Sequence, residues 1–115
     1  MIRVIIESPY KGDVKRNLAY LNALMLDCLK RDEAPIASHK LYTDILNDNN
    51  PEERKFGIEA GLVWSSVAEK IVVGTNFGVS EGMYLAIEHH MKNGVPIEYR
   101  SLDLDEIGIN LFGSK

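Results

Sequence analysis

The chain has 115 residues, of which 45% are hydrophobic and 26% are charged, and its formal net charge is −4. This length and composition predict one globular domain, residues 1–115, with a core of its own. The acidic balance and the lack of a basic stripe argue against a nucleic-acid polymer as partner, whereas a small phosphorylated ligand needs only a few local donors. No apolar run approaches the ~20 residues of a membrane span, so we expect no membrane partner. The single cysteine, Cys28, excludes an internal disulfide and fits a reducing, cytoplasmic location.

The first third of the chain predicts a strand, a helix and a second strand. Residues 3–7 (RVIIE) form a β-branched run that is typical of a buried strand. Asp13 follows a turn and can cap a helix that continues to about Arg31. Residues 34–38 (APIAS) predict a second, weaker strand. The buried face of the helix is expected to carry apolar residues at helical spacing, namely Leu18, Leu21, Met25, Cys28 and Leu29.

A second long helix is predicted after a polar loop at residues 42–50. Asn50 can cap this helix, Pro51 suits its first position, and two acidic residues follow in its first turn. We expect its apolar stripe to be buried. The stripe consists of Phe56, Ala60, Trp64 and Val67, and Gly57 and Gly61 lie close to the same side, where they could allow tight packing.

The rest of the chain repeats the alternation. Residues 70–74 (KIVVG) predict a third strand, residues 80–93 a helix that stops at Gly94, and residues 96–100 a fourth strand. The fold class that follows is α/β: a small Rossmann-like or flavodoxin-like three-layer sandwich with a mainly parallel sheet of four or five strands. The tail is expected to pack on this body through Leu102, Ile107, Ile109, Leu111 and Phe112.

Ligands in such folds bind outside the carboxyl ends of the strands, which draws attention to the loop at residues 74–83. Free backbone N–H groups at the start of the following helix favour an anion such as phosphate. Ser80 can add a hydroxyl donor, and Gly82 lets a ligand approach the backbone closely. The alternative is a plain helix cap in which Glu81 only complements the helix dipole.

The loop at residues 8–13 is the second candidate, because it follows the first expected strand. Tyr10 can stack on a base or hydrogen-bond to it. Asn17 lies one helical turn after Asp13, so the two could share a polar ligand. The alternative is a surface turn with an exposed ring and a helix cap.

The three histidines do not form a metal-binding pattern. His89 and His90 are adjacent on one expected helix and face different ways, so they make a poor chelating pair, and we expect no metal. His39 ends the second expected strand, which is a plausible position in a pocket and is also compatible with a structural role.

Five short segments follow one another in the order of a known family. They are residues 8–13 with Asn17, residues 38–39 with Leu41 and Tyr42, residues 47–54 with Gly57 and Gly61, residues 80–83, and residues 94–96. Together they resemble the phage and bacterial family similar to nucleoside 2-deoxyribosyltransferases, and they span residues 2–98. The resemblance implies a compact α/β fold, often a homo-oligomer, in the cytoplasm of a bacterium or a phage-infected cell. It also implies a nucleoside or nucleotide as ligand and no cofactor.

The resemblance also implies a mechanism, from which this chain departs at one position. In the related transferases and nucleotide N-hydrolases, a glutamate attacks the anomeric carbon of the sugar and the base leaves, which splits one hard displacement into two easier steps. The family pattern has this glutamate two variable residues after Ser-Glu-Gly-Met, where the present chain has Ala86. Glu88 is two residues further on, about 200° around the helix, and should point elsewhere.

Three explanations are compatible with Ala86. The chain is a natural binder without catalysis, it uses Glu81 or another acid in an altered mechanism, or the alanine is an engineered substitution that traps a ligand in an active enzyme. The first function to expect is therefore binding of a nucleoside or nucleotide, with N-glycosidase or deoxyribosyltransferase chemistry as the ancestral activity. The alternatives are a non-catalytic phage protein that sequesters a nucleotide-derived signal, and a structural or protein-interaction module.

Within the first function, we expect Ser80 and Gly82 to contact the phosphate or sugar and Tyr10 to contact the base or sugar. The other candidate ligand contacts are Ser8, Gly12, Asp13, Asn17, His39 and Met83.

Overall fold

The computed structural model describes residues 1–105, and its centre is a four-stranded sheet in which every strand pair is parallel. The strands are β1 (Ile2–Glu7), β2 (Glu33–Ile36), β3 (Lys70–Gly74) and β4 (Ile97–Arg100), arranged in the order β2-β1-β3-β4. The chain leaves β1 toward β2 on one side and later returns to β3 on the other, so the strand order reverses between β1 and β3. Ligands bind at such a switch point in open α/β sheets.

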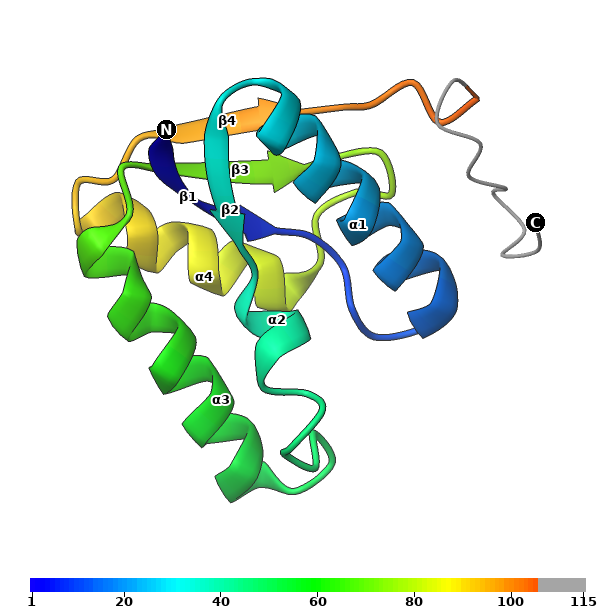
Figure 1. Cartoon of the computed structure of the whole chain (residues 1–115). Helices are drawn as coiled ribbons and strands as arrows, with labels where there is room; N and C mark the ends of the chain where they lie inside the picture. Colours follow the sequence, from blue (N-terminus) through cyan, green and yellow to red (C-terminus); the bar gives the residue numbers. More distant parts are fainter. Residues whose placement is uncertain (106–115) are drawn as a thin grey trace.

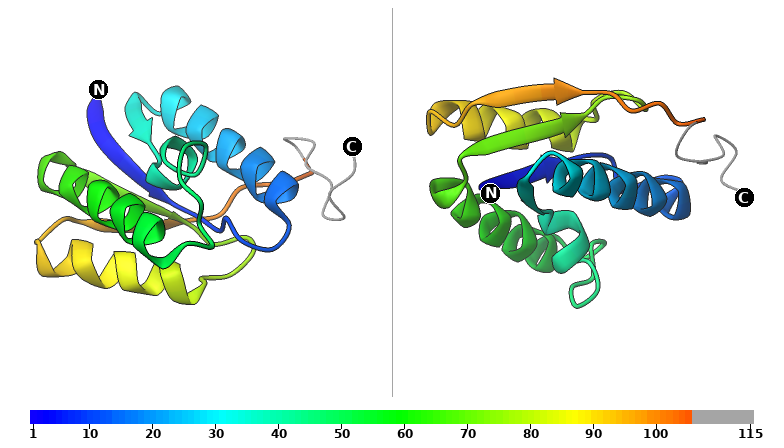
Figure 2. Two further views of the ribbon diagram at one scale, coloured as in Figure 1. Left: turned by 90° about the horizontal axis from the view of Figure 1, so that it is seen from below. Right: turned by 45° about the horizontal axis from the view of Figure 1, so that its top comes forward.

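Helices cover both faces of this sheet and complete the predicted α/β sandwich. They are α1 (Val14–Lys30), α2 (Ser38–Leu41), α3 (Pro51–Trp64) and α4 (Glu81–Lys92), with the 3₁₀ turn η1 (Ser65–Val67) after α3. α1 covers one face, and α3 and α4 lie on the other, as Figures 1 and 2 show. None of the helices within residues 1–105 is long and apolar enough to cross a membrane.

The alternation of side chains along the strands divides the core into two clusters. Val4, Ile6 and Val72 face α1, where they pack with buried residues of that helix. Ile5 and Val73 point to the opposite face and pack against α4. The residues that α1 and α4 contribute are Tyr20, Leu21, Leu24 and Cys28 from α1, and Met83 and Ile87 from α4.

The buried face of α1 differs from the predicted one. Leu29 is about half exposed, whereas Tyr20 and Leu24 are completely buried. Tyr20 tolerates burial because its hydroxyl donates to Asn76 Oδ1 at 2.7 Å and accepts from the Asn76 N–H at 3.0 Å. Asn76 also bonds to Leu102 in both directions, donating to its carbonyl at 2.8 Å and accepting from its N–H at 2.9 Å. Leu102 packs on the α1 side of the core, while the other predicted tail contacts, Ile107, Ile109, Leu111 and Phe112, lie outside the described residues.

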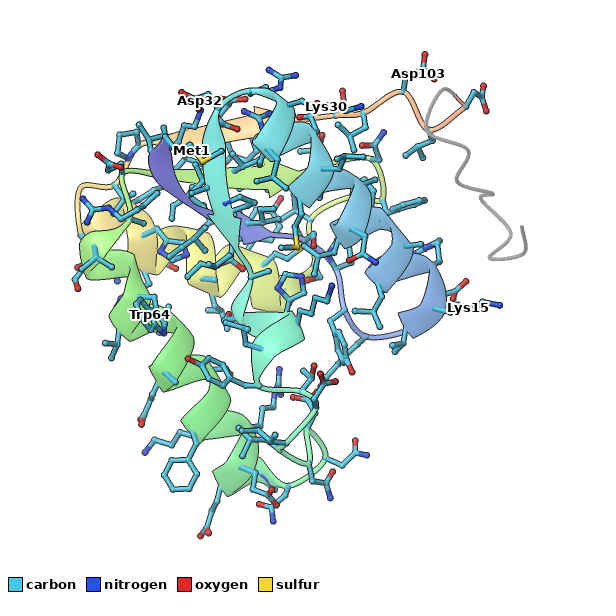
Figure 3. All side chains as sticks on the ribbon, in the orientation of Figure 1. Met1, Lys15, Lys30, Asp32, Trp64 and Asp103 are labelled. Carbon is cyan, nitrogen blue, oxygen red and sulfur yellow. The ribbon has the colours of Figure 1, made fainter. Side chains whose placement is uncertain are left out.

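The predicted apolar stripe of α3 is wrong. Phe56 and Trp64 are 62% and 47% exposed, and Trp64 is labelled on α3 in Figure 3. α3 contacts α2 through its small residues instead: a Cβ on Gly61 would lie only 2.7 Å from Ser38 Cβ and Oγ. The expected tight packing at glycine is therefore confirmed at Gly61, and it turns the large side chains outward. α2 itself begins at Ser38, where the sequence predicted the end of a strand.

A closed ionic cluster lies on the α1 face of the sheet. It consists of Glu33, Lys70, Glu98 and Arg100, and Arg100 also donates to Asp27 of α1 at 3.3 Å. The Arg100 guanidinium donates to both oxygens of Glu33, at 2.9 and 3.2 Å, and Lys70 donates to Glu33 and Glu98. The hydrogen bonds from Arg100, then those from Lys70, hold the pKa of Glu33 at about 2, against an ordinary 4.5. This cluster bridges the two edge strands of the sheet across its inner strands.

Candidate functional site

A cavity of about 600 Å³ opens at the carboxyl ends of the strands, on the face that carries α3 and α4. Its wall is made by the loop after β1, by α2 and the loop that follows it, by α3, and by the first turns of α4. Figure 1 shows these segments converging below the ends of β1 and β3. The cavity is in the size range of small-molecule sites and lies where the order of the strands reverses.

Most of the predicted site residues meet in this cavity although they are far apart in the sequence. Those that line it are Ser8, Tyr10, His39, Ser80, Glu81, Gly82, Met83 and Ala86. Ala86, at the position where the resemblance to nucleoside 2-deoxyribosyltransferases implies a glutamate, therefore lines the cavity. An alanine methyl group at this position can make an apolar contact but offers no nucleophile.

Gly12, Asp13 and Asn17 are outside the cavity lining and shape the loop after β1 instead. Asp13 caps α1 by accepting from the Arg16 N–H at 3.0 Å, and Gly12 has a φ of +94°, a conformation that favours glycine. The Asn17 amide donates to the carbonyls of Tyr10 and Lys11, at 2.9 and 3.0 Å. These bonds fix the backbone that carries Tyr10 at the cavity wall. A direct contact of Gly12, Asp13 or Asn17 with a ligand stays a prediction.

Ser8 and His39 form a pair on the cavity wall. The Ser8 hydroxyl and His39 Nε2 are 2.9 Å apart, and Ser8 is buried. Burial lowers the pKa of His39, and the negative charge of Glu7 opposes this effect. The imidazole is therefore neutral at neutral pH, so that it has one nitrogen that can accept a hydrogen bond and one that can donate.

Glu7, the last residue of β1, was missed as a site residue by the sequence reasoning. Its side chain is 12% exposed and lines the cavity, and its Oε2 is 2.8 Å from Nε2 of the buried His90. The other ring nitrogen of His90, Nδ1, is 2.7 Å from the Ser65 hydroxyl. The available signal was a carboxylate that directly follows the apolar residues 4–6 at the end of the strand. The pairing with His90 spans 83 positions and could not be found from spacing.

Two basic side chains flank an acidic one at the rim of the cavity. Lys11 Nζ is 3.5 Å from Asp48 Oδ2, and Arg54 Nε is 3.9 Å from Asp48 Oδ1. Lys11 and Arg54 are both largely exposed, so these contacts are weak and easily exchanged for contacts with an anion. From the sequence, Asp48 is interpreted as a loop charge within the matching segment at residues 47–54.

The start of α4 combines a helix cap with open space. Ser80 Oγ accepts from the Met83 N–H at 3.3 Å, which leaves its own hydroxyl hydrogen free to donate. A Cβ added at Gly82 would meet nothing within 4 Å, and Gly82 lines the cavity. A ligand can therefore come close to the backbone of this turn.

Comparisons with known proteins place the chain in a family and relate its fold to two enzymes. A family model described as a domain of unknown function (DUF7768) matches residues 2–100, and a comparison with curated proteins gives no match. The structure is similar to that of a 2-deoxyribosyltransferase from the psychrotolerant bacterium Bacillus psychrosaccharolyticus, with a TM-score of 0.66 and 14% identity over 86% of this chain and 72% of that one. It is also similar to a 2-deoxyribosyltransferase from Leishmania mexicana, with a TM-score of 0.57 and 15% identity over 94% of this chain and 72% of that one. At these identities the likeness shows a shared fold, and it confirms the expected structural relationship to 2-deoxyribosyltransferases.

Proposed function

The chain belongs to the family described as domain of unknown function DUF7768, and on that premise we propose that it binds a nucleoside or nucleotide in the cavity at the carboxyl ends of its strands. One observation carries the proposal: segments far apart in the sequence bring Ser8, Tyr10, His39, Ser80 and Gly82 to the wall of one cavity of about 600 Å³. The cavity lies at the switch point of a fold shared with 2-deoxyribosyltransferases, which supports a nucleoside-like ligand.

The lining suggests how such a ligand would be held. The Tyr10 ring offers a flat apolar surface and a hydroxyl for the base or sugar. The Ser80 hydroxyl and the open backbone at Gly82 offer donors for a sugar or phosphate oxygen, beside the positive end of α4. Lys11 and Arg54 at the rim add the positive charge that a phosphorylated ligand needs.

A second candidate function, retention of an intact nucleotide-derived signal, is favoured by Ala86. This residue lines the cavity at the position where the resemblance to nucleoside 2-deoxyribosyltransferases implies the attacking glutamate. Binding and sequestration would then use one site, and only the chemical state of the ligand after incubation separates sequestration from cleavage.

The proposal is tested by calorimetric titration of the protein with nucleosides, 2′-deoxynucleosides, their 5′-monophosphates and cyclic nucleotides. Replacing Tyr10 by Ala is expected to weaken binding about tenfold or more, because stacking on an aromatic side chain is worth roughly 1–3 kcal/mol per base. The matched control is Tyr84→Ala on α4, since Tyr84 is 63% exposed and outside the cavity lining. If none of these compounds binds, the proposal is overturned. Mass spectrometry of the recovered ligand then tells an intact nucleotide from a released base.

A further inference from the structure

Glu7 differs from the other carboxylates that line the cavity, Asp48, Glu53 and Glu81, in its burial and its partner: its side chain is 12% exposed and it bonds to a buried histidine, whereas Glu81 is exposed and the bond of Glu53 lies at the surface. Asp48 is flanked by Lys11 and Arg54, and Glu53 accepts a hydrogen bond from the Asn47 N–H. Glu7 accepts through Oε2 only, from His90. Within residues 1–105, its second oxygen, Oε1, has no hydrogen-bond partner, and no buried side-chain oxygen is left unpaired. Oε1 of Glu7 is therefore open to the cavity.

A buried histidine and the strand backbone fix the orientation of Glu7. His90 is 1% exposed, and its two ring nitrogens bond to Glu7 and to Ser65, so the imidazole has little freedom to turn. Glu7 is also the last residue of β1, where its backbone pairs with Val73 of β3. A carboxylate with a fixed backbone, one bonded oxygen and one open oxygen has the properties of a general base that is held ready for its substrate.

We propose that Glu7 is the general base of an N-glycoside hydrolysis in this cavity, which activates a water molecule for attack on the anomeric carbon of the bound nucleoside or nucleotide. The inference rests on the proposed function, since it takes the same ligand in the same site. The residue that activates the attacking water then lies at the end of β1 and not on α4, where Ala86 provides no carboxylate.

The reaction balances with water as its only co-reactant. Glu7 Oε1 takes one proton from the water as the water oxygen bonds to the anomeric carbon. The bond between that carbon and the base nitrogen breaks, and its electron pair leaves with the base. The proton held by Glu7 is then passed to the departing base, so the products are free base and free sugar, with or without its phosphate. Since water attacks directly, no glycosyl–protein intermediate forms.

The test compares Glu7→Gln with the wild-type protein. Both are incubated with the ribonucleosides, the 2′-deoxyribonucleosides and their 5′-monophosphates, while free base is measured by chromatography and ligand affinity by calorimetry. Glutamine keeps an oxygen that can accept from His90, so binding should stay within about threefold while base release falls by roughly 100-fold or more. The matched control is Glu88→Gln, on an exposed position of α4 outside the cavity lining, which should release base at the wild-type rate.

Chemical rescue separates the loss of a base from a structural fault. Glu7→Ala removes the carboxylate, and added formate should restore part of its base release. The proposal is overturned if Glu7→Gln releases base at the wild-type rate and formate has no effect on Glu7→Ala.

A measurement on the wild-type protein needs no variant and keeps the proposal testable even if both variants fail to fold. With a second free base added, direct attack by water gives no exchanged nucleoside, whereas base exchange would indicate a glycosyl intermediate and overturn the inference. Binding without any base release by the wild type would also overturn it but would leave the proposed function intact. No binding at all would remove both.

Discussion

Two groups of partly or fully buried charges lie on opposite faces of one sheet, and they are built differently. In the closed ionic cluster on the α1 face, both oxygens of Glu33 are bonded to cations, and Arg100 also reaches Glu98. At the floor of the cavity, Glu7 has a single partner and one open oxygen. A buried carboxylate with all its bonds made inside the protein has nothing left to offer a ligand. The comparison therefore separates a group that holds the fold from one that is available for chemistry.

The largest effect is expected from removing the cation at the centre of the closed ionic cluster. Arg100→Met leaves Glu33 buried without its main partner, and breaking a buried ion pair in this way destabilises a protein by roughly 3–5 kcal/mol. Urea unfolding followed by circular dichroism measures the change. A loss below about 1 kcal/mol would mean that the cluster contributes little, and the contrast with the cavity floor would disappear.

The pH dependence of stability should report on the same cluster. The pKa of Glu33 is about 2 in the folded protein and near 4.5 when unfolded, so the folded state favours the ionised form. The resulting stability is fully present above about pH 5 and is lost as the pH falls from there toward 2. It amounts to roughly 3 kcal/mol. Unfolding curves recorded at intervals across this range should therefore slope steeply for the wild type and less for Glu33→Gln. Equal slopes for the two proteins would contradict the assignment of this pH dependence to Glu33.

On the cavity side, substitutions at two glycines should distinguish a position that packs within the fold from one that faces a ligand. Gly61→Ala places a Cβ against Ser38 and is expected to destabilise the protein by roughly 1–3 kcal/mol, because α2 and α3 must move apart. Gly82→Ala meets no neighbour and should leave stability unchanged or raise it by up to about 1 kcal/mol, since alanine favours the helix more than glycine does. Calorimetric titration should nevertheless show weaker ligand binding by Gly82→Ala. Unchanged binding would argue against a ligand beside the first turn of α4.

A small effect on stability is also expected at Glu7, which lines the cavity. Glu7→Gln keeps an acceptor for His90 and should change the free energy of unfolding by less than about 1 kcal/mol, in contrast to the changes expected in the ionic cluster. The same unfolding measurement serves both regions. A loss as large as that for Arg100→Met would show that Glu7 serves the fold rather than a ligand.

The sequence predicted the framework because each element carries its own local signal. β3 occupies the predicted residues 70–74, and α3 begins with the predicted cap and proline. The carboxyl ends of parallel strands meet at one edge, so the loops after β1 and β3 could be expected to lie near each other before any contact was known.

The sequence-based predictions are wrong or incomplete where contacts between distant residues determine which side chains are buried or paired. On α3, hydrophobic spacing placed Phe56 and Trp64 in the core, because glycine adds nothing to an apolar stripe, whereas the close packing at Gly61 decides which side of α3 faces α2. The pairs Ser8–His39 and Glu7–His90 join residues 31 and 83 positions apart, and no periodicity relates such residues. The polar chemistry of the cavity is thus a product of the fold and not of any single motif.

Asn76 has a consequence for how the molecule can move. Its side-chain amide bonds to the carbonyl and the N–H of Leu102, as the backbone of a neighbouring strand would. The pairing along β4 is thereby continued past its last residue by a side chain. The same residue stands in the loop that leads to Ser80, and it is tied to Tyr20 beneath the sheet. The segment that leaves β4 and the loop that enters α4 are therefore joined at Asn76, next to the bonds of Thr75 to the Arg100 carbonyl, so neither can shift alone without breaking these bonds.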